Sequence, residues 1–274
     1  MKKNNCTACM VVKNEDRFVW YGINSVLPYV DRFLITDTGS TDKTVEIIKA
    51  IKDEKIALTR KEKVTPALLT RYRQEQIDKT ETAWLWLVDG DEVYPEKTAQ
   101  KIRRIMSEGD KYDGIIAHRF DLLGDIYHRQ RETVGSYNQF GLRGHYVLRC
   151  LRVKAFSDLN VLGDYPDEYF ADGAVHVKKR GRDRFALVQE PLFHSMYLQR
   201  STAGKKLQNV LNRQNYKIEL GLAVNPENLP DIFFAIRPPI VPEVLGKISV
   251  IYLIAAALIT PVKILKRKLM EIKI

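Results

Sequence analysis

Three carboxylates crowd the end of one apolar run, in the stretch WLWLVDGDEVYPE that covers residues 84–96. Asp89 and Asp91 are separated by one residue, and Glu92 follows directly. Two carboxylates at this spacing can hold a divalent cation that bridges the oxygens of a phosphate group. An ordinary solvated turn is the alternative, because acidic residues are common after strands. The spacing favours a site for a metal ion and a phosphate.

Short apolar runs alternate with longer stretches of helical period over the first third of the chain. The runs cover residues 7–12, 32–36, 56–59 and 84–88. This alternation predicts βαβ units and a mostly parallel sheet. In such sheets ligands bind at the carboxyl ends of the strands. Glu15, Asp37 and Asp89 follow three of the runs, so we expect their side chains at that edge.

Two common phosphate-binding loops are missing from the sequence. The first apolar run continues into KNEDRFVWYG, which has no glycine before Gly22. Backbone amides therefore cannot cradle a pyrophosphate there as they do in dinucleotide-binding folds. The chain also lacks the G-x-x-x-x-G-K-[ST] pattern. A diphosphate at this edge would need its charge neutralised by a cation on Asp89 and Asp91.

Three ordered motifs within residues 7–95 resemble the nucleotide-sugar half of family 2 glycosyltransferases. They are the strand end VKNE, the turn DTGSTDKT and the acidic pair DGD. The resemblance implies an α/β GT-A (Rossmann-like) fold, with a mostly parallel sheet flanked by helices and a C-terminal apolar or amphipathic helical appendage. It also implies an inverting, metal-dependent hexosyltransferase that uses a nucleotide-diphosphate sugar, with a UDP-sugar favoured and Mn²⁺ or Mg²⁺ as the cofactor.

The same resemblance implies roles for residues of the three motifs. Asn14 and Glu15 would line the nucleoside pocket, and Asp37 would lie near the nucleobase or ribose. Asp89 would lie near the ribose or the metal ion. Asp91 would be a metal ligand.

Two further candidates lie outside the motifs. Arg73 stands sixteen residues before Asp89, where many relatives keep an arginine that faces the nucleotide, and Arg71 is the alternative. Without the resemblance, arginines on a polar helix face are more often solvent-exposed. His194, in EPLFHSMYLQRS, is a candidate metal ligand by the same resemblance, since a neutral imidazole suits an ion such as Mn²⁺. A packed or surface histidine is the alternative.

The stretch VLGDYPDEYFADGAVHV supplies candidates for a general base. An inverting sugar transfer needs a carboxylate on the acceptor side to take the proton of the attacking hydroxyl. Asp167 and Glu168 are the candidates, and Asp172 and His176 come next. A solvated acidic loop is the alternative for each of them.

The predicted organisation is one catalytic domain with an appendage. Residues 1–225 form the GT-A domain, divided into a nucleotide-sugar half (1–95) and an acceptor half (96–225) with further strands at 114–118 and 145–153. Residues 226–274 form a membrane-associating C-terminal helical region.

The tail combines apolar length with positive charge. Residues 248–262 are fifteen uncharged residues, followed by the cations Lys263, Lys266, Arg267 and Lys268. A helix of this length covers ~22 Å, less than the ~30 Å of a bilayer core. A re-entrant or interfacial placement on anionic lipids is therefore favoured over spanning. A buried C-terminal helix or an oligomer contact is the alternative.

Composition adds expectations about partners and location. The net charge of +10 favours anionic partners, and no aromatic-interleaved basic motif indicates nucleic acid. Three cysteines form no disulfide framework, and Cys6 and Cys9 are interpreted as strand residues. We expect a peripheral or monotopic protein on the cytoplasmic face of the cell membrane, with a glycan or a polyprenyl or other lipid-linked acceptor. A non-catalytic, basic, membrane-tethered binding protein is the second hypothesis.

Overall fold

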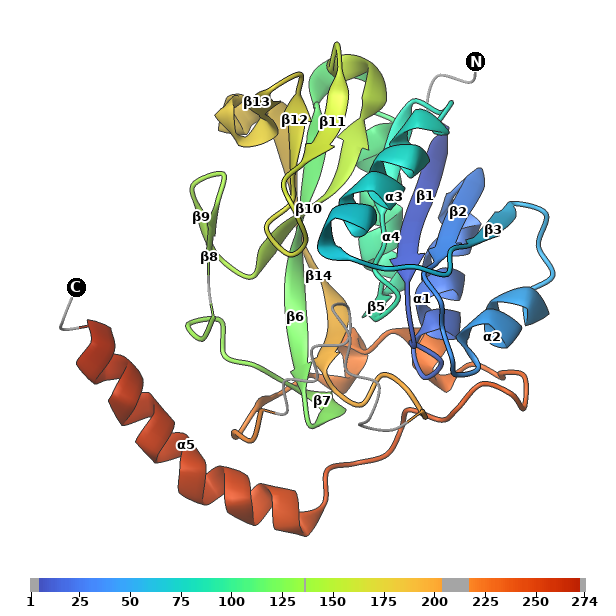
Figure 1. Ribbon diagram of the computed structural model, residues 1–274. Helices are drawn as coiled ribbons and strands as arrows, with labels where there is room; N and C mark the ends of the chain where they lie inside the picture. Colours follow the sequence, from blue (N-terminus) through green and yellow to red (C-terminus); the bar gives the residue numbers. More distant parts are fainter. Residues whose placement is uncertain (1–4, 136, 204–216, 272–274) are drawn as a thin grey trace.

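The computed structural model of the 274-residue chain describes residues 5–135, 137–203 and 217–271. Its first strands are β1 (Cys6–Val12), β2 (Arg32–Asp37), β3 (Ile56–Arg60) and β4 (Trp84–Leu87). They are joined by the helices α1 (Val19–Val26), α2 (Thr44–Ala50) and α3 (Pro66–Asp78). The predicted strands and the helical stretches between them are confirmed (Figure 1).

Later elements extend these strands into one ten-stranded sheet. They are β5 (Glu92–Val93), α4 (Glu96–Met106), β6 (Gly114–Leu123), β7 (Asp125–Arg129), β10 (Tyr146–Arg152), β14 (Phe185–Tyr197) and β15 (Leu222–Ala223). The strand order is β15-β7-β6-β10-β4-β1-β2-β3, and β14 pairs with β6 and β5. β6 and β10 confirm the strands predicted at 114–118 and 145–153.

Most of the neighbouring strands around β1 and β14 run parallel. β1 is parallel to β2 and β4, β2 is parallel to β3, and β14 is parallel to β6. β10 lies between β4 and β6 and is antiparallel to both. Two small sheets complete the strands: β8 (Tyr137–Gln139) with β9 (Leu142–Gly144), and β11 (Leu159–Leu162), β12 (Tyr169–Asp172) and β13 (Val175–His176).

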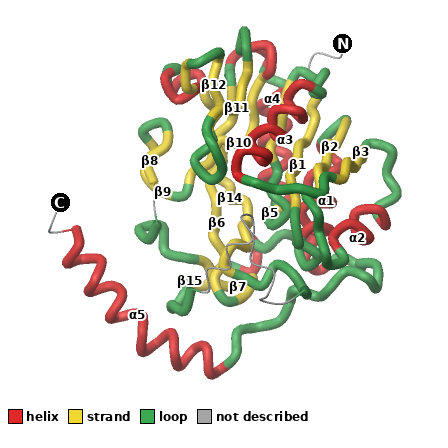
Figure 2. The backbone as a smooth tube through the Cα atoms, viewed as in Figure 1, coloured by secondary structure: helices red, strands yellow, loops and turns green. Residues whose placement is uncertain are grey.

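Side-chain alternation along the strands builds a hydrophobic layer on each face of the sheet. In β4, Trp84 and Trp86 belong to one layer, and Leu85 and Leu87 belong to the other. The first layer packs against α1, α2 and α4, and the second against α3 and the sheet β11–β13. Figure 2 shows α3 lying across the parallel strands. Both faces are covered, which explains why the parallel strands read as continuous apolar runs.

The C-terminal region differs from the predicted division at residue 226. Residues 226–249 contain 3-10 turns at Pro226–Asn228 and Asp231–Phe234, and four of their apolar side chains belong to the main core: Leu229, Phe233, Val241 and Val244. Phe233 is fully buried against the rings of Tyr21 and Phe193. The helical appendage is therefore α5 (Val250–Glu271), and the chain before it is part of the globular domain.

Helix α5 turns its polar side toward the protein. Tyr252 Oη donates to the Glu219 carbonyl at 3.3 Å, and Thr260 Oγ1 accepts from the Leu220 amide at 2.8 Å. Arg267 pairs with the Glu219 carboxylate at 2.7 Å. The outward side is apolar, and these residues are each more than half exposed: Val250, Ile251, Ile254, Leu258, Val262, Leu265 and Leu269. The alternative of a buried C-terminal helix is therefore wrong for the isolated chain.

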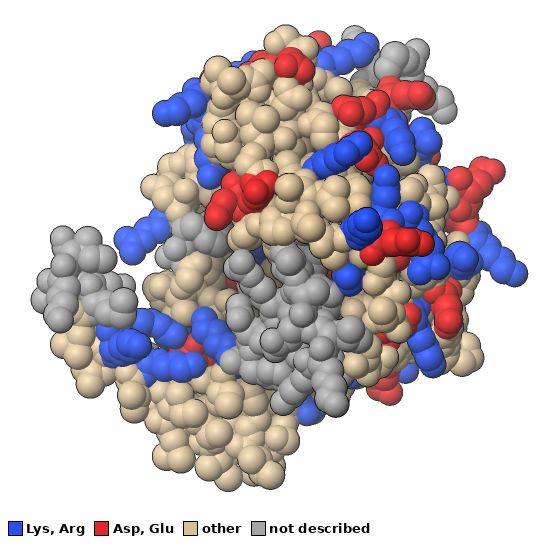
Figure 3. Space-filling model, viewed as in Figure 1, with Lys and Arg blue, Asp and Glu red and all other residues tan. Residues whose placement is uncertain are grey.

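The apolar and basic parts of the tail form one continuous helix of 22 residues that passes through Pro261. In Figure 1, α5 extends along the outside of the molecule, at the end opposite the N-terminus. Figure 3 shows an uncharged surface at that end, with Lys and Arg side chains gathered beside it. Across the described parts of the chain, no helix combines the length and the apolarity needed to cross a membrane.

The packing of Phe233 predicts a large difference between two adjacent phenylalanines. We expect Phe233→Ala to lower the free energy of unfolding by about 3–5 kcal/mol, because it opens a cavity between Tyr21 and Phe193. Phe234 is 54% exposed, so Phe234→Ala should change it by about 0.5 kcal/mol or less. Urea unfolding followed by tryptophan fluorescence measures both. Equal effects would place residues 226–249 outside the core.

Candidate functional site

The loops after β1 and β2 meet at the carboxyl edge of the sheet. Gly39 has a φ of +89°, which glycine adopts without strain, and it turns the chain after β2. Asn14 Oδ1 accepts a hydrogen bond from the backbone amide of Thr41 at 2.8 Å, and the backbone amide of Asn14 donates to Ser40 Oγ at 2.9 Å. The first two sequence motifs therefore form one continuous wall.

Asp37 lies at this edge, but its carboxylate is occupied by the turn that follows it. Its oxygens accept from the amides of Gly39 and Ser40 at 3.2 Å, and Arg60 Nε is 3.6 Å away. The side chain is fully buried. In this structure Asp37 shapes the loop, and its contact with a nucleobase or ribose stays a prediction.

Two arginines hold Asp89. Arg149 Nη2 donates to Asp89 Oδ2 at 2.8 Å, and Arg73 Nη2 is 3.4 Å from Oδ1. Burial alone would raise the pKa of Asp89, but Arg149 and Arg73 outweigh it and lower the pKa to about 2. Arg149 also pairs with the fully buried Glu92, so two of the three crowded carboxylates share one guanidinium.

Asp91 lies between an arginine and a histidine. Its Oδ2 is 2.9 Å from Arg200 Nη1 and 3.3 Å from His194 Nε2. The second ring nitrogen of His194 is 2.9 Å from Asp121 Oδ1. Burial lowers the pKa of His194, but Asp91 and Asp121 outweigh it and raise the pKa to about 9. Arg200 is also 3.0 Å from Glu15 Oε1, so it connects the loop after β1 to the acidic pair.

Arg73 extends the site to one of the two candidate bases. Arg73 Nε is 3.4 Å from Glu168 Oε1, while its Nη2 contacts Asp89. Asp167 is exposed, and no side-chain contact joins it to the described part of the site. Arg71 points away, being 74% exposed and paired with Glu75. The structure thus brings Arg73 and Glu168 to the acidic pair, and leaves Arg71 and Asp167 outside.

Three of the predicted residues carry a buried polar atom that lacks a hydrogen-bond partner in the described structure. These atoms are Asn14 Nδ2, Glu15 Oε2 and Glu168 Oε2. Leaving a buried polar atom unsatisfied costs about 1–3 kcal/mol. Burial also raises the pKa of Glu15 well above its ordinary value, although Arg200 opposes this. A polar ligand bound at this edge of the sheet could supply the missing hydrogen-bond partners.

The remaining candidates lie elsewhere. Asp172 accepts from Ser157 and pairs with Arg180 at 2.6 Å, and the ring of His176 stacks on Tyr169, both at the small sheet β11–β13. Cys6 and Cys9 are buried in β1, as expected for strand residues, and burial raises the pKa of Cys9 to about 12. None of these groups contacts the acidic pair in the described structure.

Asp91 and His194 could supply two ligands to a divalent cation that also binds a ligand, once the His194 ring has lost the proton that its raised pKa favours. Two ligand atoms of one octahedral ion are about 3 Å apart, and Asp91 Oδ2 and His194 Nε2 are separated by 3.3 Å. Asp121 orients the imidazole ring of His194 through its Nδ1 atom, as carboxylates commonly do for metal-binding histidines. Within the described residues, no three His, Cys, Asp or Glu side chains form a metal-binding group. Phosphate oxygens would therefore have to complete the coordination, and Arg200 would have to yield its place on Asp91.

Comparison with protein families decides which fold family this site belongs to. The model of glycosyl transferase family 2 matches residues 7–157, which is more than half of the chain. The chain belongs to glycosyl transferase family 2. The match covers the motifs at the sheet edge, which include Asp89 and Asp91, and it also covers Arg73 and Arg149. Membership favours an enzyme over the non-catalytic binding protein that the sequence also allowed.

Solved structures resemble this family 2 member only distantly. Residues 1–349 of S. aureus TarS have 12% identity and a TM-score of 0.46, with 70% of this chain and 60% of TarS covered. Glucosyl-3-phosphoglycerate synthase from Mycobacterium tuberculosis, in complex with Mn²⁺, UDP and phosphoglyceric acid, has 16% identity and a TM-score of 0.45, with 70% of each chain covered. The chain thus covers less than two thirds of the TarS fragment. No curated protein sequence matches it significantly. The assignment therefore rests on the family model.

Arg149, Arg200 and Asp121 are the site residues that sequence reasoning missed. The pairing of β10 with β6 slips between Leu148 and Cys150, and this bulge lies at Arg149. Bulges are common beside active sites because they redirect a side chain. A cation inside the apolar strand HYVLRCLRV was an available signal. Arg200 offered none, because its role depends on how the chain folds back after β14.

Proposed function

We propose that this family 2 glycosyltransferase moves a sugar from a nucleotide-diphosphate donor, with a UDP-sugar favoured, to an acceptor hydroxyl with inversion of configuration. The observation that carries the proposal is the convergence of Asp89, Asp91, Arg73 and Glu168 at the carboxyl edge of the sheet. The unsatisfied atoms of Asn14 and Glu15 on the adjoining wall support a nucleoside pocket there.

A divalent cation, Mn²⁺ or Mg²⁺, is part of the proposal. Asp91 and His194 would hold it, with Asp89 close by. When bound, the cation would neutralise the charge that develops on the departing diphosphate. Arg73 and Arg149 lie beside the acidic pair and add fixed positive charge on the same side.

Glu168 is the better placed of the two candidate bases. In an inverting transfer the acceptor oxygen attacks the anomeric carbon from the face opposite the diphosphate. The bond to the diphosphate breaks with its electron pair, and the hydroxyl proton passes to a carboxylate. Glu168 Oε2 has no hydrogen-bond partner in the described structure, while Arg73 holds Oε1. This leaves one oxygen for the acceptor hydroxyl.

We also propose that α5 lies on the cytoplasmic surface of a membrane and brings the enzyme to a lipid-linked acceptor. Its outward apolar face and the exposed cations Lys266 and Lys268 have the composition of an interfacial helix on anionic lipid, whereas Lys263 and Arg267 contact residues 218–219 of the domain. Polar residues, among them Thr260 and Arg267, attach its other side to the domain. We propose that the outward face of α5 binds an anionic bilayer; binding to a second copy of the chain is the competing outcome.

The metal proposal predicts a specific effect of Asp91→Asn. Binding of Mn²⁺ in the presence of UDP should weaken about 10-fold or more, because the neutral amide is a poorer ligand than the carboxylate. Electron paramagnetic resonance of free Mn²⁺ measures this, with turnover of UDP-sugars as a second readout. Asp78→Asn, a surface variant on α3, serves as the control, and thermal unfolding verifies that both variants are folded. Unchanged Mn²⁺ binding would place the cation elsewhere.

The two candidate bases are distinguished by matched amide substitutions. Glu168→Gln should lower kcat for transfer by about 100-fold or more, with donor affinity changed little, because the amide cannot take the proton. Asp167→Asn should retain most activity, since its side chain is exposed and apart from the acidic pair. Donor affinity is measured by calorimetry with UDP. If Asp167→Asn is the inactive variant, the assignments are reversed.

The membrane proposal predicts that charge on the outer face of α5 releases the protein. Ile254→Glu with Leu258→Glu should weaken co-sedimentation with anionic vesicles by roughly 10-fold or more, because two apolar contacts are replaced by repelled carboxylates. Val175→Glu is the control, since Val175 is 59% exposed on β13 at the far end of the molecule. A stable dimer without vesicle binding, abolished by the same substitutions, would show that α5 pairs two copies instead.

A further inference from the structure

A cavity of about 790 Å³ lies between α5 and the segment that follows β7. The segment contributes residues 130–134, and β9 contributes Arg143 and Gly144. Helix α5 closes the other side with Thr260, Ile264, Arg267 and Lys268. Its volume lies within the range of small-molecule sites, about 300–1,000 Å³. The cavity is separate from the acidic pair at Asp89 and Asp91.

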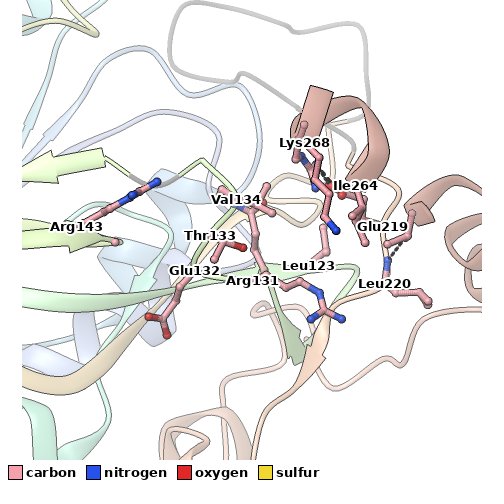
Figure 4. Close-up of a pocket in the computed structure, with 14 residues that line it drawn as sticks. Leu123, Arg131, Glu132, Thr133, Val134, Arg143, Glu219, Leu220, Ile264 and Lys268 are labelled. Carbon is pink, nitrogen blue, oxygen red and sulfur yellow. Dashed lines mark hydrogen bonds and ion pairs between the residues drawn. The ribbon is translucent and has the colours of Figure 1, made fainter. Parts of the chain in front are cut away.

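The lining of this cavity carries an excess of positive charge. Its two carboxylates already have partners. Glu132 pairs with Arg129 at 3.1 Å, and Glu219 pairs with Arg267 at 2.7 Å. Figure 4 shows the Glu132 carboxylate pointing away from the other labelled side chains.

Three cations of the lining remain without an ion pair among the described residues, namely Arg131, Arg143 and Lys268. Figure 4 shows Arg143 and Lys268 approaching from opposite sides of Val134. Guanidinium and ammonium groups that line one cavity without a carboxylate partner favour an anionic ligand, and phosphate oxygens match both groups well. The chemistry of the lining is therefore that of a phosphate site.

A short run of buried side chains connects the cavity wall to the acidic pair. Val134, which lines the cavity, has its carbonyl oxygen 2.9 Å from His145 Nε2. His145 Nδ1 is 3.5 Å from Asp121 Oδ2, and Asp121 in turn holds His194. These contacts link the cavity wall to His194, which in turn contacts Asp91.

The same helix that closes the cavity carries the apolar outer face. Thr260 and Arg267 point inward, whereas Leu258, Val262 and Leu265 on the neighbouring turns point outward. A ligand with a phosphate in the cavity could therefore extend an apolar chain along α5. Free phosphate compounds would use the cations alone and gain nothing from the helix.

We infer that the cavity between α5 and residues 130–134 binds the phosphate group of a lipid-linked acceptor, whose hydrocarbon chain follows the outer face of α5. This inference rests on the proposed function, because it names the class of acceptor and where its phosphate is held. Arg131, Arg143 and Lys268 bind the phosphate.

The test uses full-length protein and neutral phosphatidylcholine vesicles that contain a small fraction of a long-chain prenyl phosphate. We expect these vesicles to bind the protein more tightly than vesicles with the same charge supplied by phosphatidylglycerol. The variant R131Q/R143Q/K268Q should lose this preference, with about 10-fold to 100-fold weaker binding to the prenyl phosphate vesicles. The control K154Q/K178Q/K179Q removes the same charge from exposed lysines near β11–β13 and should keep the preference.

Three outcomes would overturn the inference. Equal losses in the cavity variant and the control would reduce the effect to general charge attraction. Equal binding of both vesicle types, with the same sensitivity to the cavity variant, would make the site one for ordinary phospholipid headgroups. Competition by millimolar glucose 1-phosphate as effective as that of prenyl phosphate would make the ligand a free phosphate ester.

Binding of UDP, measured by calorimetry on the same samples, separates this inference from the proposed function. Protein that binds UDP but shows no preference for prenyl phosphate contradicts the cavity assignment alone. Protein that binds neither UDP nor GDP, ADP, CDP or dTDP, in the wild type and in every variant, contradicts the proposed function.

Discussion

Carboxylates cannot be buried side by side unless cations are buried with them, and this constraint organises the whole site. The chain after β4 places three carboxylates within four residues. Their partners come from α3 as Arg73, from β10 as Arg149, and from the end of β14 and the chain beyond it as His194 and Arg200. Elements separated by more than a hundred residues are therefore fixed to one point. The two halves of the domain are interdependent, because losing either one would leave buried charge uncompensated.

Local sequence was sufficient wherever a residue's role depends on its own strand or turn. Apolar runs located the parallel strands, motif spacing located Asp89 and Asp91, and the family resemblance favoured Arg73 over Arg71. Arg149 acquires its role only when β10 inserts between β4 and β6 with a bulge, which no local pattern specifies. Asp167 and Glu168 were indistinguishable in the sequence, because the direction of a loop backbone decides which of two neighbours turns inward.

The C-terminal region shows the same limit on a larger scale. Its apolar composition indicated helix, but it could not distinguish residues that fill the core from residues left uncovered. Residues 226–249 reach back to complete the core around Phe233. Helix α5 then reverses the usual arrangement, in which an amphipathic helix packs its apolar stripe inward. Only the partners of its polar side, Glu219 and Leu220, reveal which face is turned out.

The hydrogen bonds between α5 and residues 219–220 attach the helix to the domain in one orientation. Strand β15, just after this segment, pairs with β7, and β7 adjoins β6, which carries Asp121. Any surface that covers the outer side of α5 therefore lies at a fixed distance from the acidic pair. This fixed distance would set a length requirement. Molecules anchored in that surface would be selected by how far their reactive end stands above it, as well as by what they are.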